Sequence, residues 1–144
     1  MPKRLPLKIF LKTFAYAPRM AVSLIIESKK KEVLLARRAI APLKGKWHLP
    51  GGFVLKGESI NECIKRVASK ELGLRVNPSS ATLLGLFDDL DKDPRGHVID
   101  AIYKLKISAF PKTTEETQEL KFFKKLPPRM GFNHAETLRK LGYK

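Results

Sequence analysis

Cysteine is almost absent from the sequence, since Cys63 is the only one among 144 residues. This excludes an intrachain disulfide and a multi-cysteine zinc site, and Cys63 is expected to be a small buried filler. Long apolar runs are missing too, because the stretch Ala21 to Ile26 is broken by Ser23 and is far shorter than the ~20 residues of a membrane span. Residues 1–19 are basic but lack the apolar stretch of a secretory signal. We therefore expect a cytoplasmic protein with no membrane contact.

Acidic residues are scarce: 14 Asp and Glu stand against 29 Lys and Arg, which leaves a formal charge of +15. Such a charge draws phosphate-bearing molecules toward a protein. We expect a small anionic, phosphate-containing substrate, and nucleic acid is a further candidate partner. Lysines that only keep the surface hydrated would explain the charge equally well, because no repeated basic and aromatic pattern occurs. The oligomeric state stays open.

The chain length and a hydrophobic fraction of 43% predict one domain over residues 1–144, with a basic N-terminal segment at residues 1–19. Residues 20–28 (MAVSLIIES) and 31–38 (KEVLLARR) are rich in branched apolar side chains and predict two strands joined as a hairpin. Residues 96–107 (GHVIDAIYKLKI) alternate with period two, which predicts a strand buried on one face.

Helical spacing appears in two places. Residues 60–72 repeat apolar side chains at helical intervals, with Ser59 and Glu62 as a capping box and Gly73 as the stop. Residues 134–141 predict a second helix, with Asn133 as its cap and Glu136 three residues on. Strands, a helix, more strands and a closing helix, without regular alternation, predict an α+β fold or a layered αβα sandwich.

A glycine-rich loop, GKWHLPGGFVLKGES at residues 45–59, leads into the first predicted helix. Its four glycines and one proline favour tight turns, and the loop ends at a helix N-terminus with free N–H groups. A phosphate fits such a position. Arg37 and Arg38 precede the loop and are therefore candidate phosphate ligands, although a surface cation is the alternative for Arg38.

The spacing of Gly52, Glu58, Arg66, Glu71 and Gly73 resembles the Nudix box, in which a glycine, a glutamate and an arginine are separated by five and seven residues before a run of acidic positions. The match covers residues 52–74. The resemblance implies a Nudix-type αβα sandwich with a mixed central sheet. It also implies hydrolysis of a nucleoside diphosphate linked to another moiety, with Mg²⁺ or Mn²⁺ as cofactor.

Two of the three carboxylates that the family places on this helix are replaced here, by Val67 and Lys70, and only Glu71 remains. GDP-mannose mannosyl hydrolases resemble this pattern and use one metal. By that resemblance, Glu71 and the carbonyl of Gly51 would hold a single divalent ion. The glutamine–histidine pair of those enzymes has no counterpart in residues 114–123, which contain no histidine, so their substrate does not transfer.

Two further segments carry candidate site residues. The stretch DKDPRGHVIDAIY at residues 91–103 resembles the corresponding loop and strand of ADP-ribose pyrophosphatases, which makes Arg95 and His97 candidate substrate contacts. In TEETQEL, at residues 114–120, Glu116 and Glu119 are candidates for the additional metal carboxylate that Nudix enzymes often supply from such a loop.

Several roles have two explanations at this point. Glu58 precedes a helix, where the dipole favours a carboxylate in any protein, and it is also a candidate catalytic residue. Arg66 is explained either by an ion pair with Glu62 or by orienting a carboxylate of the site.

The sequence leaves two functions open for the whole chain. The chain is either a hydrolase that uses Glu71, Arg66 and Glu58, or a catalytically inactive Nudix-fold module that binds nucleotide or RNA.

Overall fold

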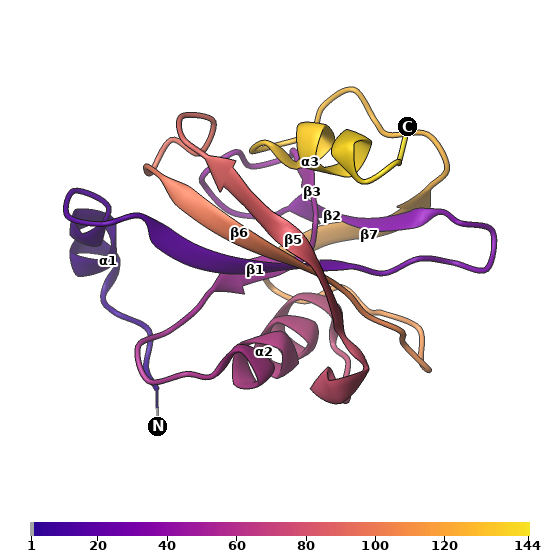
Figure 1. Cartoon of the computed structure of the whole chain (residues 1–144), viewed down its shortest axis with the longest axis horizontal. Coiled ribbons are helices and arrows are strands. Elements are labelled where there is room, and N and C mark those ends of the chain that lie inside the picture. The colour runs from indigo at the N-terminus through magenta and orange to yellow at the C-terminus, as the bar shows by residue number, and fades with distance from the viewer. Residues whose placement is uncertain (1) are drawn as a thin grey trace.

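The computed structural model describes residues 2–144 as two β-sheets with helices on both outer sides (Figure 1). In Figure 1, α2 lies below the sheets and α3 above them. In chain order the elements are α1 (Leu7–Thr13), β1 (Arg19–Ile25), β2 (Val33–Arg38), β3 (Trp47–His48), β4 (Gly51–Phe53), α2 (Ile60–Leu72), the 3₁₀ helix η1 (Pro78–Ser80), β5 (Thr82–Asp89), β6 (Val98–Lys104), β7 (Thr117–Phe123) and α3 (His134–Lys140). Within residues 2–144, no helix combines the length and apolarity needed to cross a bilayer.

The larger sheet is mixed. Its strand order is β4-β1-β6-β5, where β1 runs parallel to β6 and antiparallel to β4. The smaller sheet, β3-β2-β7, is antiparallel. The α+β class and the layered sandwich with a mixed sheet are therefore confirmed.

The predicted hairpin of residues 20–38 is wrong beyond its turn. The turn forms, with the Ser28 N–H donating to the Glu32 carbonyl and the Leu34 N–H to the Ile26 carbonyl. The strands then separate, because β1 pairs with β4 and β6 while β2 pairs with β3 and β7. Both strands bury side chains on two faces, which a two-stranded hairpin cannot provide.

Helix α2 forms as predicted. The Ser59 side chain accepts from the Glu62 N–H, the Glu62 side chain accepts from the Ser59 N–H, and Gly73 ends the helix in the left-handed conformation at φ 62°. Its apolar face packs on β1, β2 and the residues after β6. The buried members of this cluster are Val22, Leu24, Ile26, Leu34, Cys63, Ile64, Val67, Ala68, Leu72, Leu74 and Leu105. The prediction that Cys63 is a buried filler is confirmed.

Strand β6 is buried on both faces, not on one as predicted, because it lies in the sheet interior between β1 and β5. Ile102 points to the α3 side, where it joins a second cluster with Leu138 of α3. Helix α3 forms as predicted, but its side-chain cap does not: the Asn133 amide donates to the Asp88 carbonyl, 2.7 Å away, and makes no cap bond.

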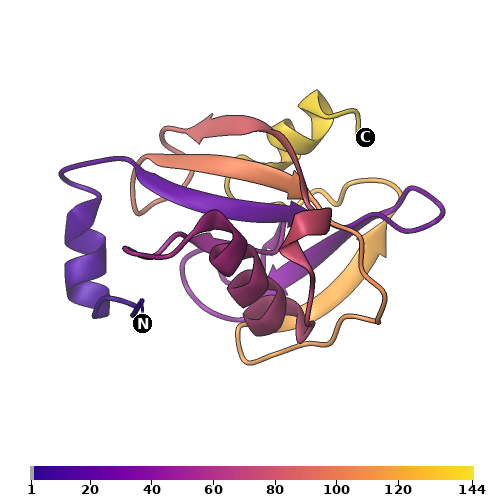
Figure 2. The ribbon, with the colours of Figure 1, turned by 60° about the horizontal axis from the view of Figure 1, so that its bottom comes forward.

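Helix α1 was not predicted, and it covers one end of the molecule (Figure 2). None of its residues is buried. Its attachment is aromatic: the ring of Phe10 and that of Phe14, the C-cap residue, meet the Phe53 ring edge-on at 5.2 and 5.7 Å. The Arg19 guanidinium lies 5.3 Å from the centre of the Phe10 ring. The basic N-terminal segment therefore folds against the end of β4.

Candidate active site

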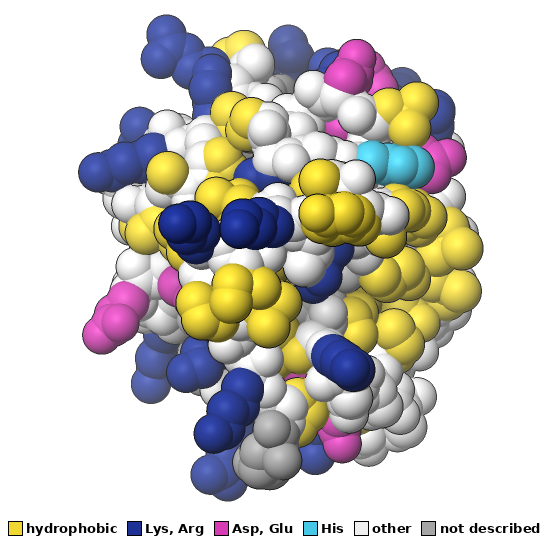
Figure 3. Space-filling view, turned by 90° about the vertical axis from the view of Figure 1, so that its left-hand side faces the viewer, with side chains coloured by type: hydrophobic (Ala, Val, Ile, Leu, Met, Phe, Trp, Pro, Cys, Tyr) yellow, Lys and Arg dark blue, Asp and Glu magenta, His cyan; other side chains and the backbone are white. Residues whose placement is uncertain are grey.

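A cavity of about 620 Å³ opens where α1, β1, β4, α2, the β5–β6 loop and the segment before α3 meet. Figure 3 shows the side of the molecule that carries α1, on which Lys and Arg side chains outnumber Asp and Glu. Six of the residues predicted from the sequence line the cavity: Arg38, Gly51, Arg66, Glu71, Arg95 and Glu116. Four do not: Arg37, Glu58, His97 and Glu119.

Glu71 lies at the wall of this cavity, near the C-terminal end of α2, and is only 7% exposed. The Thr117 hydroxyl lies 3.0 Å from its Oε2. Burial raises the pKa of Glu71 to about 7; the Thr117 hydrogen bond acts in the other direction, and the neighbouring carboxylate of Glu116 raises it further. A carboxylate that is costly to ionise alone gains from a bound cation.

Gly51 lines the cavity at the start of β4, paired with Ser23 of β1. A Cβ on Gly51 would lie 2.7 Å from both the Ser23 Oγ and the Val22 carbonyl oxygen, so no larger residue fits without moving β1. The close approach of these strands brings the backbone of Gly51 to the cavity wall.

Arg66 pairs with Glu58, not with Glu62. Its Nε and Nη2 donate to the two Glu58 carboxylate oxygens at 2.8 and 3.0 Å, and Nη2 also donates to the Phe53 carbonyl at 2.6 Å. The Glu58 side chain is 5% exposed and accepts a further bond from the Leu55 N–H. Burial raises the pKa of Glu58, but the hydrogen bonds from Arg66 and Leu55 outweigh it, and the net shift is downward. This clamp ties α2 to the end of β4.

The two residues that replace family carboxylates differ in environment. Val67 is 1% exposed and belongs to the apolar cluster beneath α2, although its edge reaches the cavity. Lys70 is exposed and lines the cavity on the same side as Glu71. An ammonium group in this position opposes cation binding and favours phosphate.

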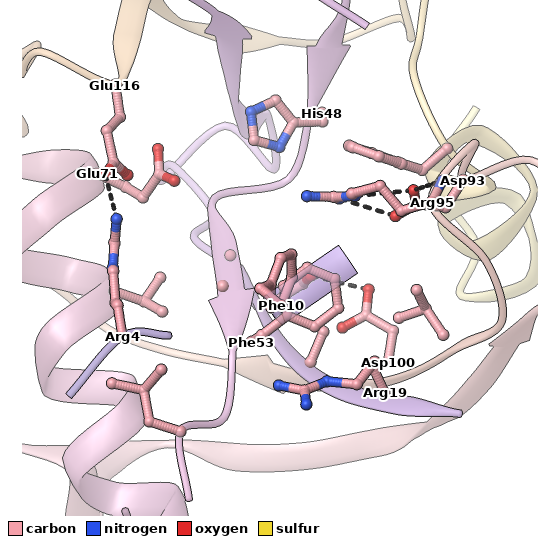
Figure 4. Close-up of a pocket in the computed structure, with 18 of the residues that line it drawn as sticks. Arg4, Phe10, Arg19, His48, Phe53, Glu71, Asp93, Arg95, Asp100 and Glu116 are labelled. Atoms are coloured by element: carbon pink, nitrogen blue, oxygen red, sulfur yellow. Dashed lines mark hydrogen bonds and ion pairs between the residues drawn. The ribbon is translucent and has the colours of Figure 1, made fainter. Parts of the chain in front are cut away.

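The two glutamates predicted as extra metal ligands are separated. Glu116 lines the cavity, and its carboxylate forms a 3.0 Å ion pair with Arg4 of the N-terminal segment (Figure 4). Glu119 lies opposite Arg37 in the β2–β7 pairing, and the two side chains approach to 3.7 Å at the surface. Arg37 and Glu119 therefore pair with each other outside the cavity.

Two further arginines, Arg38 and Arg95, line the cavity. The Arg38 guanidinium lies 5.2 Å from the centre of the Phe132 ring and donates to the Pro42 carbonyl; burial, then the charge of Arg95, lowers its pKa. Arg95 is held by the buried carboxylate of Asp93, at 2.9 and 2.8 Å, between the Phe53 and Phe132 rings. His97 lies outside, 3.8 Å from Asp88.

A buried polar group, missed by the sequence reasoning, forms part of the cavity wall. The Ser23 hydroxyl donates to Asp100 Oδ2 at 2.8 Å, and His134 Nε2 lies 3.3 Å from the same oxygen. His48 stacks on His134, with ring centres 6.1 Å apart. The only sequence signal was one acid, Asp100, inside an otherwise apolar strand.

We expect His48→Gln to make stability less sensitive to acid. Burial, followed by the nearby His134 and Arg38, lowers the pKa of His48 well below its usual value. Below about pH 6.5, His48 therefore binds a proton in the unfolded chain but not in the folded protein. This lowers the free energy of unfolding by up to ~1.4 kcal/mol per pH unit. The stability that depends on neutral His48 is fully present above about pH 6.5 and is lost as the pH falls below that value. Urea unfolding at about pH 7.5 and 5.5 should give a steeper loss for the wild type, and equal losses would contradict the prediction.

A divalent cation would find oxygen donors here, which suits Mg²⁺ or Mn²⁺. Among residues 2–144, no group of three or more His, Cys, Asp or Glu side chains is placed to hold a metal. The donors that fit are the buried Glu71 carboxylate, the Glu116 carboxylate and the Gly51 carbonyl, all at the same cavity. This set provides few protein ligands and leaves positions for water and phosphate oxygens.

Comparison with known proteins agrees with the fold. The NUDIX domain model matches residues 17–141. An ADP-ribose pyrophosphatase from Methanocaldococcus jannaschii is 38% identical over 85% of this chain and 72% of its own length. A crystal structure of a MutT NUDIX hydrolase from Burkholderia pseudomallei aligns with a TM-score of 0.76 at 27% identity, over 87% of this chain and 98% of that one. The NUDIX domain of Shewanella oneidensis NrtR, crystallised with ADP ribose, aligns with a TM-score of 0.70 at 20% identity over 95% of this chain and 97% of that one, a likeness of fold. The chain belongs to the Nudix hydrolase superfamily.

Proposed function

We propose that the protein hydrolyses a nucleoside diphosphate linked to a second moiety, of the ADP-ribose class, and needs a divalent metal to do so. The observation that carries the proposal is the buried Glu71 carboxylate at the wall of a cavity large enough for such a substrate. The resemblance over 85% of the chain to an ADP-ribose pyrophosphatase supports the choice of substrate class.

Glu71, Glu116 and the Gly51 carbonyl would hold one Mg²⁺ or Mn²⁺. When bound, the ion would neutralise charge on the diphosphate and lower the pKa of a bound water. Arg38 and Arg95 face the cavity and would bind the phosphate oxygens, each held in place by contacts of its own. The product would be a nucleoside monophosphate and the phosphorylated second moiety, formed by attack of water at phosphorus.

The clamp of Arg66 and Glu58 would act as a positioning device in this reaction. It touches the Phe53 carbonyl and the Leu55 N–H, so it fixes the segment that runs from Gly51 toward α2. The metal donors Gly51 and Glu71 lie on the two elements that the clamp joins. Their separation therefore depends on it.

A second candidate is a module that binds nucleotide or RNA without hydrolysis. It is favoured by Val67, which is buried in apolar surroundings, and by Lys70, whose ammonium lines the cavity where the family carries carboxylates. Charge-driven binding of this kind should weaken steeply between about 50 and 200 mM salt and should persist with a chelator. Metal-dependent hydrolysis should disappear with the chelator.

The test is a substrate panel of ADP-ribose, nucleotide sugars and dinucleoside polyphosphates with Mg²⁺, with Mn²⁺ and with EDTA. We expect metal-dependent release of a nucleoside monophosphate from ADP-ribose. Hydrolysis in ¹⁸O-labelled water identifies the point of attack, because label on a phosphate product means attack at phosphorus. A panel without turnover, together with salt-sensitive RNA binding, would overturn the hydrolase in favour of the binding module.

Lys70→Glu is expected to strengthen metal binding in the absence of nucleotide. The change replaces the cation next to Glu71 in the chain by an anion, and a change of about 1.4 kcal/mol in charge interaction corresponds to a roughly tenfold lower Kd for Mn²⁺. Lys65→Glu is the matched control, since it makes the same change at an exposed position of α2 that does not line the cavity. Titration with Mn²⁺ measures both, and equal Kd values for the two variants would place the metal away from α2.

A further inference from the structure

The cavity wall contains a carboxylate that the proposed reaction does not use. Asp100, on β6, is 4% exposed and lines the cavity. In the sequence it is well separated from the proposed metal donors Gly51, Glu71 and Glu116. One of its oxygens, Oδ2, accepts from the Ser23 hydroxyl at 2.8 Å and lies 3.3 Å from His134 Nε2. Among residues 2–144, the other oxygen, Oδ1, is buried and has no hydrogen-bond partner.

An unpartnered buried carboxylate oxygen is unusual. Buried polar atoms in folded proteins are hydrogen-bonded in the large majority, because a bare acceptor loses its hydration without replacement. In Figure 4 the Asp100 side chain stands among the pocket residues, and only one of its oxygens carries a dashed line. Oδ1 therefore has the features of an acceptor whose donor comes from a ligand.

The trio of Ser23, Asp100 and His134 is not a nucleophilic triad. The serine hydroxyl donates to the aspartate and not to the histidine. The histidine Nδ1 accepts the Leu49 N–H at 2.9 Å, so in the neutral ring the proton is on Nε2, which faces Asp100. Both neighbours thus contact Oδ2 and fix the orientation of the carboxylate, which leaves Oδ1 free to accept.

The charge of Asp100 restricts the ligand group it can meet. An ionised carboxylate accepts hydrogen bonds and repels phosphate. The phosphates of a diphosphate would therefore lie toward the arginines and the metal donors, and a neutral group with O–H donors would lie at Asp100. The Phe10 and Phe53 rings line the same cavity and suit the apolar face of a sugar.

We propose that Asp100 Oδ1 accepts a hydrogen bond from a sugar hydroxyl of the substrate and thereby selects ribosylated diphosphates. Ser23 and His134 act as positioning residues that hold the acceptor. The inference rests on the proposed function for the identity of the substrate, but the binding contact itself does not require hydrolysis. It assigns to β6 a specificity role that is separate from the metal donors on α2 and β4.

The experiment compares three diphosphates with wild type and Asp100→Asn. They are ADP-ribose, an analogue with 2′,3′-dideoxyadenosine, and an analogue whose terminal ribose is replaced by an alkyl group without hydroxyls. For the wild type we expect kcat/KM to fall roughly tenfold or more with one of the two analogues, mostly through KM. In Asp100→Asn the amide oxygen should stay with Ser23 and His134, so an uncharged NH2 group replaces the acceptor and kcat/KM for ADP-ribose should fall toward that of the analogue. The analogue that discriminates identifies which ribose meets Asp100.

Asp89→Asn is the matched control. Asp89 is also 4% exposed, but its Oδ1 is satisfied by the N–H groups of Lys92 and Asp93. This variant should keep the wild-type preference among the three compounds, even if its melting temperature falls. Ser23→Ala should show an intermediate loss of preference, and it serves as the test if Asp100→Asn does not fold.

The outcomes separate the two proposals. The role of Asp100 is overturned if the wild type has the same kcat/KM for all three compounds. It is also overturned if Asp100→Asn keeps the wild-type ratio of kcat/KM values. If the wild type hydrolyses none of them, the proposed function fails, and calorimetric titration with ADP-ribose in EDTA decides the inference. Binding that weakens roughly tenfold in Asp100→Asn supports the contact, and equal affinities overturn it.

Discussion

Glu71→Gln is expected to reduce metal-dependent hydrolysis of a nucleoside diphosphate by at least about a hundredfold, which corresponds to ~3 kcal/mol of lost transition-state stabilisation. Glutamine keeps the shape of the side chain and still accepts from the Thr117 hydroxyl, so the fold should persist. The charge that would attract the cation is lost. Initial rates over a range of Mg²⁺ concentrations measure the effect, and activity near the wild-type level would put the metal elsewhere.

The same variant should be more stable than the wild type when no metal is present. Burial raises the pKa of Glu71 to about 7, against 4.5 for an ordinary glutamate. The penalty for ionising it therefore develops as the pH rises from about 4.5 to about 7 and is complete above that. At about pH 8 the melting temperature of metal-free Glu71→Gln should exceed that of the wild type, and its increase with Mg²⁺ should vanish.

Glu115→Gln is the control for this pair of measurements. It makes the same chemical change on an exposed glutamate that does not line the cavity. Its rate, its melting temperature and its response to Mg²⁺ should all match the wild type. A similar loss in both variants would indicate that net charge, and not the buried position of Glu71, controls the metal response.

Helix α2 was predictable because its signals are local. The capping box at Ser59, the apolar face and the stop at Gly73 lie within fifteen residues, and each is visible in the structure. The Nudix-box resemblance added the register that brings Glu71 to the cavity wall. Here the sequence determines both the element and the direction of its side chains.

The sheets were less predictable because their pairing is not local. Apolar runs at residues 20–26 and 33–36 favour strands, but the same pattern suits a hairpin and two separate sheets. The structure separates β1 from β2, since each buries side chains on two faces and needs neighbours of its own. Helix α1 was missed because it has no buried residue and is attached through Phe10 and Phe14.

The residues of the candidate site also differ in whether they could be predicted from local sequence. Glu71, Arg66 and Gly51 lie in one segment, and their placement at or beside the cavity could be anticipated. Asp100 and His134 come from distant elements, so only the fold brings them together. Strand pairing also explains why Glu119 faces Arg37 at the surface, whereas Glu116, before the strand begins, reaches the cavity.

Arg66→Met is expected to lower the free energy of unfolding by about 3–5 kcal/mol, more than any of the other single substitutions described above. The guanidinium makes two bonds to Glu58 and one to the Phe53 carbonyl. Its loss leaves a carboxylate that is 5% exposed with one backbone donor, the Leu55 N–H. Urea unfolding of the metal-free protein at neutral pH measures the change.

The double variant Arg66→Met with Glu58→Gln separates the pair from its surroundings. Most of the expected cost arises from an uncompensated buried charge, so removing the second charge should restore at least half of the lost free energy. The bond to Phe53 stays broken, and therefore the end of β4 should remain loosely held against α2. If the clamp positions Gly51 relative to Glu71, the double variant should regain stability without regaining metal affinity or hydrolysis. Recovery of all three together would mean that Arg66 acts only through the charge of Glu58.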